Sequence, residues 1–328
     1  MINLPARQFE DTPSKRDKVP LLVGLFGPSS SGKTFSALRL ATGIQKISGG
    51  DIYVIDTESR RALHYADLFK FRHIDFRAPY GSLDYLAALQ HCADKNAGVI
   101  VIDSMSHEHE GVGGYLQFQE AELDRIAGDD EAKRKRSTFL AWKAPSAHRR
   151  RLINGILQMN TNFVFCFRAK EKLKIVPGQN PIELGFMPIA GDEFLYEMTA
   201  AALLLPGAGG VPTWHPQMPG ERLMVKVPEQ FRRIVKDDGP PLDEAFGATM
   251  AEWSKGGDEL PPPPRQERKP TFPEWMMARA DEGMASLNEA VARVREGTNQ
   301  ARIEWVDERW PMLLERAERA DAPPEDEP

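Results

Sequence analysis

Short apolar runs alternate with amphipathic stretches along the first half of this chain. Four short apolar runs have the length of buried strands: 21–26, 52–55, 99–102 and 163–167. Between them, apolar residues recur at the spacing that places them on one face of a helix. Strands that alternate with helices predict an α/β fold, in which a mostly parallel sheet is flanked by helices.

The pattern changes after residue 167. Three shorter strand candidates follow, at 173–176, 201–205 and 223–227, and turn-rich segments such as PGQNP and PGAGGVP separate them. Short strands joined through such turns are typical of antiparallel pairing. We therefore expect an antiparallel or mixed extension of the same sheet.

A proline-rich segment, SKGGDELPPPPRQERKP, divides the sequence. Its four consecutive prolines favour an extended spacer over helix or sheet. Beyond it, helix-forming composition predicts two helices, in which Trp275, Trp305 and Trp310 form a small core or a docking face for a protein partner. The expected divisions are a flexible arm at 1–18, a core domain at 19–253, the linker at 254–270, a small helical segment at 271–320 and an acidic tail at 321–328.

Composition narrows the class of protein. Of the 328 residues, 41% are hydrophobic and 27% charged, which is enough to bury a core and excludes a disordered chain. The net charge of -6 argues against a protein that coats nucleic acid through its overall field. Cys92 and Cys166 lack metal-ligand spacing and predict neither a disulfide framework nor a zinc site. Without a membrane-length apolar stretch or a signal peptide, we expect a cytoplasmic protein that does not contact membranes.

The segment GPSSSGKT matches the phosphate-binding pattern G-x-x-x-x-G-K-[ST]. A strand candidate precedes it and a helical stretch, FSALRLATGIQKI, follows it, which is the context that such a loop requires. Lys33 is expected to reach the β- and γ-phosphates of ATP, and the Thr34 hydroxyl to coordinate Mg²⁺. The predicted nucleotide-binding residues are Gly27, Pro28, Ser29, Ser30, Ser31, Gly32, Lys33, Thr34 and Phe35.

Two of the strand candidates end in acidic residues. Asp103 follows the run VIVI and is predicted to serve Mg²⁺ through a coordinated water, with Ser104 helping to orient that shell. The run IYVI is followed by DTE, whose Glu58 projects past the carboxyl edge where nucleotides bind in open α/β sheets. We predict that Glu58 is the general base that activates water.

The segment HEHE at 107–110 follows the predicted Mg²⁺-side strand. Its histidines lack the spacing of a zinc-binding helix, so we predict no dedicated metal site there. Glu108 and Glu110 remain alternatives to Glu58 as the general base.

Four motifs follow one another along the chain: a strand with GPSSSGKT, a strand ending in IDTE, the run VIVIDS and the run FVFCFRAKEK. In this order they resemble the RecA-like recombinase superfamily, over residues 19 to 230. The chain is similar in particular to the phage and prophage P-loop ATPases of the AAA type that are grouped with single-strand annealing proteins. The resemblance implies that Glu58 activates water, that Asp103 serves Mg²⁺ and that Arg168 senses the γ-phosphate. The chain departs from the family pattern at Arg168, where glutamine or another neutral polar residue is common.

The strand candidate 163–167 ends abruptly in cations. Arg168, Lys170 and Lys172 are expected near the phosphates, where they stabilise the transferring phosphoryl group in the same subunit or in a neighbouring one. The alternative is an ordinary solvated basic loop.

Positive charge is concentrated in KRKRSTFLAWKAPSAHRRR at 133–151, which contains no acid. Cations that follow phosphates, interleaved with aromatic rings on which bases stack, are typical of a single-stranded DNA site. The alternative is an exposed helix face whose cations pair with the upstream acids Glu120, Glu122, Asp124 and Asp129. The candidate DNA-binding residues are Lys133, Arg134, Lys135, Arg136, Trp142, Lys143, Arg149 and Arg150.

These features predict a RecA-like P-loop ATPase that hydrolyses ATP with Mg²⁺ and assembles into a homo-oligomer. The resemblance implies a role in DNA recombination or single-strand annealing in a phage or prophage, with hydrolysis stimulated by DNA. A second hypothesis is a nucleotide-gated interaction protein, in which ATP binding orders loops for a replication or packaging partner. A third is a small-molecule kinase, which would need an acceptor pocket.

Overall fold

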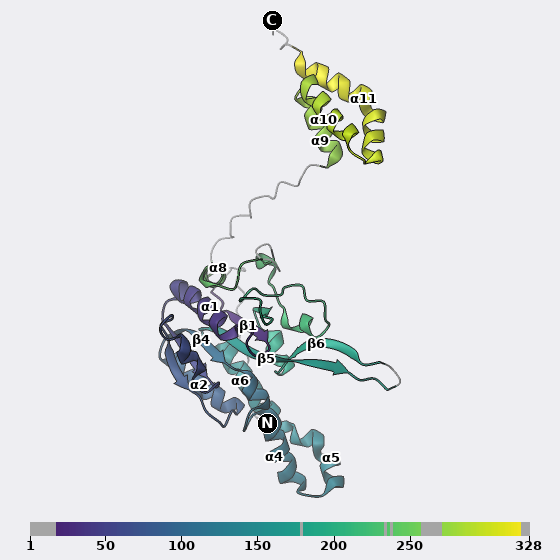
Figure 1. Cartoon of the computed structure of the whole chain (residues 1–328). Coiled ribbons are helices and arrows are strands. Elements are labelled where there is room, and N and C mark those ends of the chain that lie inside the picture. The colour runs from purple at the N-terminus through teal and green to yellow at the C-terminus, as the bar shows by residue number, and fades with distance from the viewer. Residues whose placement is uncertain (1–17, 178–179, 233–234, 237–238, 257–270, 323–328) are drawn as a thin grey trace, which may run out of the picture. The chain divides into compact units, whose positions relative to one another are not determined.

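The computed structural model describes residues 18–177, 180–232, 235–236, 239–256 and 271–322 (Figure 1). Most of the expected amino-terminal arm, of the proline-rich linker and of the acidic tail therefore lies outside the described residues. The chain divides into two compact units, Met1–Asp258 and Glu259–Pro328.

A seven-stranded sheet forms the centre of the first unit. Six strands lie in the order β3-β2-β4-β5-β1-β7 and pair in parallel, while β6 pairs antiparallel with β5. The strands are β1 (Leu22–Gly27), β2 (Asp51–Asp56), β3 (Arg72–Asp75), β4 (Ala97–Asp103), β5 (Asn162–Lys174), β6 (Ile182–Pro188) and β7 (Ala200–Leu203).

Alternation along each central strand divides the apolar residues between the two faces of the sheet. On β5, Val164 and Cys166 pack on one face, whereas Phe163, Phe165 and Phe167 pack on the other. Helices α1 (Lys33–Ser48) and α8 (Glu244–Ser254) cover the first face, and α2 (Ser82–Asp94) and α6 (Lys143–Gln158) cover the second. This arrangement confirms the predicted α/β class and explains why the buried runs 52–55, 99–102 and 163–167 of the central strands are apolar at every position.

Two extensions leave this core (Figure 1). Helices α4 (Tyr115–Ala127) and α5 (Glu131–Ala141) form a helical hairpin, which α3 (Ser106–Glu110) connects to the end of β4. The outer half of β5 and β6 form a long antiparallel hairpin. The remaining short elements are η1 (Arg61–Tyr65), α7 (Asp192–Glu197), η2 (Glu221–Met224) and η3 (Glu229–Phe231).

The four central strands and 201–205 are confirmed as β1, β2, β4, β5 and β7. The separate strand at 173–176 is wrong, because β5 continues without a break to Lys174. The strand at 223–227 is also wrong. Its first half is the 3-10 helix η2, and only Lys226 forms an isolated bridge to Ala201. Both β3 and β6 were missed, since β3 is a polar edge strand and β6 contains Gly185 at φ +70°.

The second unit contains three helices within its described residues, where the sequence predicts two. They are α9 (Phe272–Asp281), α10 (Met284–Glu296) and α11 (Gln300–Asp321). These helices enclose their own apolar core around Met276, Leu287 and Leu313, and Trp275, Trp305 and Trp310 pack against it partly buried. In the part of the chain that the structure describes, no helix combines the length and apolar character needed to span a membrane.

Candidate functional site

The carboxyl ends of four parallel strands meet at one edge of the sheet. In the strand register, Gly27 at the end of β1 pairs with Arg168 of β5, and Asp56 of β2 pairs with Asp103 of β4. A cavity of about 690 Å³ opens at this edge. Its lining residues are Ser29, Ser30, Ser31, Gly32, Lys33, Thr34, Glu58, Arg61, His64, Tyr65, Asp103, Glu110, Arg168, Ala169 and Ile189.

The loop between β1 and α1 depends on two glycines. A Cβ on Gly27 would lie 2.2 Å from the carbonyl oxygen of Leu204 and 2.6 Å from Ser31 Oγ, so no side chain fits there. Gly32 has φ +83°, a left-handed conformation that L side chains rarely adopt. Helix α1 then begins at Lys33, which places its positive amino-terminal end at the cavity.

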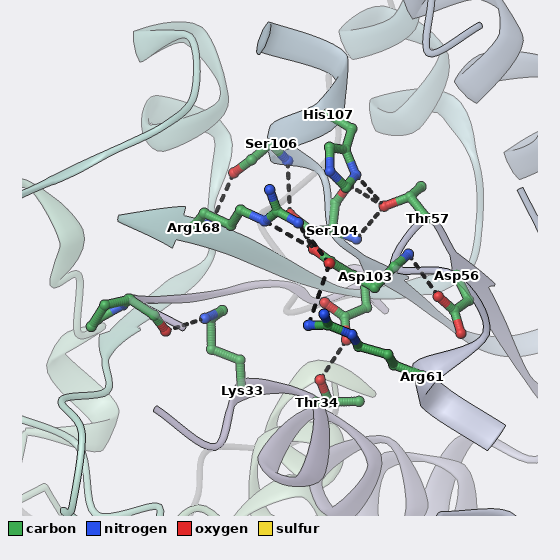
Figure 2. A network of polar contacts seen from close by, with 12 residues as sticks. Lys33, Thr34, Asp56, Thr57, Arg61, Asp103, Ser104, Ser106, His107 and Arg168 are labelled. Atoms are coloured by element: carbon green, nitrogen blue, oxygen red, sulfur yellow. Dashed lines mark hydrogen bonds and ion pairs between the residues drawn. The ribbon is translucent and has the colours of Figure 1, made fainter. Parts of the chain in front are cut away.

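Lys33 fills the loop with its own ammonium group (Figure 2). Its Nζ donates hydrogen bonds to the carbonyl oxygens of Gly27 at 2.9 Å and Pro28 at 2.7 Å. Burial lowers the pKa of the Lys33 ammonium below its usual value. The two carbonyl groups hold the Lys33 ammonium inside the loop, where its positive charge would strongly stabilise a phosphate anion.

Thr34 and Asp103 lie together on the floor of the cavity (Figure 2). The Thr34 hydroxyl donates a hydrogen bond to Asp103 Oδ2 at 2.5 Å. Hydroxyl and carboxylate oxygens are the hard ligands that Mg²⁺ prefers in proteins. The two residues fit a Mg²⁺ ion that completes its shell with water and phosphate oxygens.

Burial raises the pKa of the Asp103 carboxyl from 3.8 to about 6. A folded-state pKa above the unfolded value means that ionisation of Asp103 lowers the free energy of unfolding. This loss of stability is absent below about pH 4 and complete above about pH 6. Two pKa units correspond to about 3 kcal/mol. Without Mg²⁺, we expect Asp103→Asn to raise the free energy of unfolding by about 3 kcal/mol more at pH 8 than at pH 4.

Urea unfolding with EDTA at both pH values measures this difference, and the exposed Asp67 provides a control as Asp67→Asn. An equal effect of Asp103→Asn at both pH values would show that the carboxyl ionises without penalty in the folded chain.

Glu58 and Arg168 both line the cavity and are in direct contact. Arg168 Nη2 donates to both carboxylate oxygens of Glu58 at 2.6 Å, and its Nε donates at 2.9 Å. Arg61 approaches the same carboxylate from the other side at 3.9 Å. The predicted base and the predicted phosphate sensor thus form one ion pair, although 110 residues separate them in sequence.

A layer of polar residues fixes the strand ends behind this pair. Asp56 accepts hydrogen bonds from the backbone N–H groups of Glu58 at 2.8 Å and Ala62 at 2.9 Å, which shapes the turn after β2. Ser106 Oγ accepts the Arg168 backbone N–H at 2.8 Å. These contacts hold the backbone of Glu58 and Arg168 in place, and both side chains line the cavity.

Glu110 also lines the cavity, where the sequence offered it only as an alternative base. Five further lining residues were given no nucleotide role from the sequence: Arg61, His64, Tyr65, Ala169 and Ile189. The first three lie on η1, within seven residues of Glu58. That proximity, together with the aromatic ring of Tyr65, was the available signal. Phe35 lies outside the cavity lining and packs against Tyr65, with ring centroids 5.7 Å apart.

Glu108 is unsuited to be the reserve base because it is 1% exposed and already partnered. Arg149 Nη2 donates to Glu108 Oε2 at 2.8 Å, and Ser82 Oγ donates to Oε1 at 2.6 Å. The same pair corrects the DNA-binding prediction for Arg149. Its side chain is buried, with the guanidinium 3.3 Å from the centroid of the Tyr115 ring, and is inaccessible to a phosphate backbone.

Other parts of the basic segment also differ from the expectation. Arg134 pairs with Glu120 and Asp124 on α4, which is the alternative that the sequence left open. Trp142 is partly buried, and its ring lies 5.0 Å from that of Tyr115. The cations of this segment that remain exposed are Lys133, Lys135, Arg136, Lys143, Arg150 and Arg151.

Comparison with known proteins agrees with the geometry of this edge. A family model described as an AAA domain matches residues 20–199, a range that includes every strand end of the cavity. A search of curated proteins finds no match to the chain.

Proposed function

Because this chain belongs to the AAA domain family of P-loop ATPases, we propose that it binds ATP with Mg²⁺ in the cavity at the sheet edge and hydrolyses it to ADP and phosphate. The observation that carries the proposal is the gathering of a phosphate loop, a hydroxyl–carboxylate pair and a glutamate–arginine pair around one cavity. Each of these groups has a separate task in phosphoryl transfer.

Binding depends on the loop and its lysine. The backbone N–H groups around Gly32 and the positive end of α1 attract the phosphates, and Lys33 exchanges its two carbonyl partners for phosphate oxygens. Thr34 and Asp103 hold Mg²⁺, which neutralises charge on the β- and γ-phosphate oxygens when bound.

Hydrolysis assigns different tasks to the two members of the ion pair. Glu58 accepts a proton from the water that attacks the γ-phosphorus, as the bond to the ADP oxygen breaks. Arg168 exchanges its contact with Glu58 for the oxygens of the γ-phosphate and stabilises the charge that develops there. The pair therefore separates when nucleotide enters, which leaves the carboxylate free to act as a base.

We expect the adenine base of ATP to stack against Tyr65. This ring lines the cavity and is supported from behind by Phe35. We expect Tyr65→Ala to weaken ATP binding by about tenfold through loss of stacking, and to leave the affinity for tripolyphosphate unchanged because that ligand lacks a base. Isothermal titration with Mg²⁺ and each ligand measures both affinities; an equal loss for both would place the base elsewhere.

The helical hairpin of α4 and α5 is the proposed contact for single-stranded DNA. Phe139 is 90% exposed, and Lys135, one helical turn before it, lies on the same face of α5. Lys133 and Arg136 add exposed positive charge to this helix. An exposed ring among cations that have no ion-pair partner within the described residues is suited to stacking one base while the cations contact the flanking phosphates.

Loss of charge and loss of stacking should have different effects on DNA binding. Replacing Lys133, Lys135 and Arg136 with alanine should reduce the slope of log affinity against log salt by about 0.7 for each lost phosphate contact. Phe139→Ala should cost about 1–3 kcal/mol of affinity at an unchanged slope. Fluorescence anisotropy across a salt series with ATP measures both, with Arg125→Ala on α4 as the control. Wild-type behaviour of both variants would make this an ordinary solvated surface.

For the biological setting, the resemblance to RecA-like recombinases supports a role in phage or prophage DNA recombination or annealing, with subunits assembled as a homo-oligomer. A nucleotide-gated interaction protein with slow turnover is the second candidate. One observation favours it. Arg168 forms a bidentate contact with the Glu58 carboxylate, so the proposed general base is already engaged before nucleotide binds. Stimulation of hydrolysis by single-stranded DNA would support the first function over the second.

A further inference from the structure

The second unit has a cavity of its own, far from the phosphate loop in sequence. It has a volume of about 340 Å³, which lies within the range of ligand pockets, about 300–1,000 Å³. Its walls come from the start of α9, the end of α10 and the start of α11. The lining residues are Phe272, Trp275, Arg293, Val294, Gly297, Asn299 and Arg302.

Both apolar and cationic side chains line this cavity, and one arginine lies directly against an aromatic ring. Phe272 and Trp275 lie with ring centroids 6.2 Å apart and, with Val294, form an apolar surface packed against the core of the unit. Arg302 lies over the Phe272 ring at 5.0 Å, and no carboxylate among the described residues pairs with its guanidinium. Within the described residues Arg293 pairs with Glu289 alone, through side chains that are 68% and 65% exposed, so this contact exchanges readily.

The charge of the cavity is opposite to that of the unit around it. Residues 271–321 contain eleven acidic residues, seven arginines and no lysine. Nevertheless, the charged residues that line the cavity are both arginines, and none is acidic. A cavity lined by positive side chains within an acidic unit is suited to bind an anion. Its aromatic side chains are suited to bind an apolar group of the same ligand.

We propose that this cavity binds an acidic peptide segment of a partner protein, with one apolar side chain against Phe272 and Trp275 and flanking carboxylates on Arg293 and Arg302. Guanidinium groups bind carboxylates through paired hydrogen bonds, and aromatic pockets are suited to a single anchoring side chain. The net negative charge of the unit disfavours acidic segments that lack the anchor, which makes binding depend on both features. This inference does not depend on ATP hydrolysis by the first unit.

The test uses the full chain and fluorescein-labelled peptides. The probe is a short peptide with aspartates on both sides of one phenylalanine, and the comparison peptides replace the phenylalanine with serine, the aspartates with asparagine, or the aspartates with lysine. We expect anisotropy to show binding of the probe alone, weakened by salt. Arg293→Glu together with Arg302→Glu should lower its affinity about tenfold to a hundredfold.

Two controls separate this result from loss of structure. Arg293→Glu alone changes a side chain that is 68% exposed and whose ion-pair partner among the described residues is the exposed Glu289, so it should weaken binding without changing the circular dichroism spectrum. Arg319→Glu, near the far end of α11, should bind as wild type. The proposal is wrong if the probe does not bind at about 1 mM, if all four peptides bind equally, or if Arg319→Glu has the same effect. It is also wrong if the double variant changes the sedimentation coefficient instead, because a second copy of the chain would then occupy the cavity.

Discussion

Lys33→Ala should abolish detectable ATP hydrolysis and weaken ATP binding by about a hundredfold or more. The ammonium is buried at the centre of the loop, where its charge is poorly screened, and alanine has no group that reaches a phosphate. The loop itself should survive, because its course is fixed by Gly27 and Gly32 and by the start of α1. Isothermal titration and a phosphate-release assay measure the two losses.

A matched control lies on the same helix. Lys46 is exposed in the last turn of α1, so Lys46→Ala removes the same charge without touching the loop and should retain wild-type binding. Circular dichroism should show the same helical content in both variants. Hydrolysis at the wild-type rate by Lys33→Ala would mean that the phosphates bind somewhere other than this loop.

Glu58→Gln should separate binding from turnover. The phosphates and Mg²⁺ keep their partners in this variant, so ATP affinity should change little, while the rate of hydrolysis should fall by about 10²–10⁴ because the water loses its base. Glutamine also cannot form the ion pair with Arg168, which removes one competitor for that arginine before nucleotide arrives. Single-turnover hydrolysis with pre-bound ATP measures the chemical step directly.

Glu110 is the appropriate comparison for this variant. It lines the same cavity, and its ion-pair partner in the part of the chain that the structure describes is Lys170, at 3.5 Å. Glu110→Gln should therefore hydrolyse ATP at close to the wild-type rate. If the loss of turnover appears in Glu110→Gln and not in Glu58→Gln, the base is Glu110, and Glu58 serves only to position Arg168.

Much of the site could be predicted because its parts are local in sequence. The loop at 27–34 contains its own glycines, lysine and threonine, and Asp103 directly follows an apolar strand. Parallel strands have their carboxyl ends at one edge of the sheet. Once the strands were identified, Asp103 and Glu58 were therefore expected beside the phosphate loop. The alternating faces of the sheet likewise follow from residue spacing alone.

What the sequence did not reveal depends on packing between distant elements. The pairing of Glu108 with Arg149 requires α3 and α6 to enclose both charges, and nothing in the basic run HRRR distinguishes the buried arginine from its exposed neighbours. Arg168 contacts Glu58 only because β5 and β2 lie on either side of β4. The half-exposed strand β3 lacks the apolar character that marks a central strand.

The most direct test of the central claim is phosphate release from ATP by the full chain, with Lys33→Ala as the blank and with no acceptor molecule added. Sustained turnover that requires Mg²⁺ and disappears in the blank is the predicted result. Tight binding of ATP with no phosphate above the blank, whether or not single-stranded DNA is present, would contradict an ATPase and leave a nucleotide-gated interaction protein as the better account.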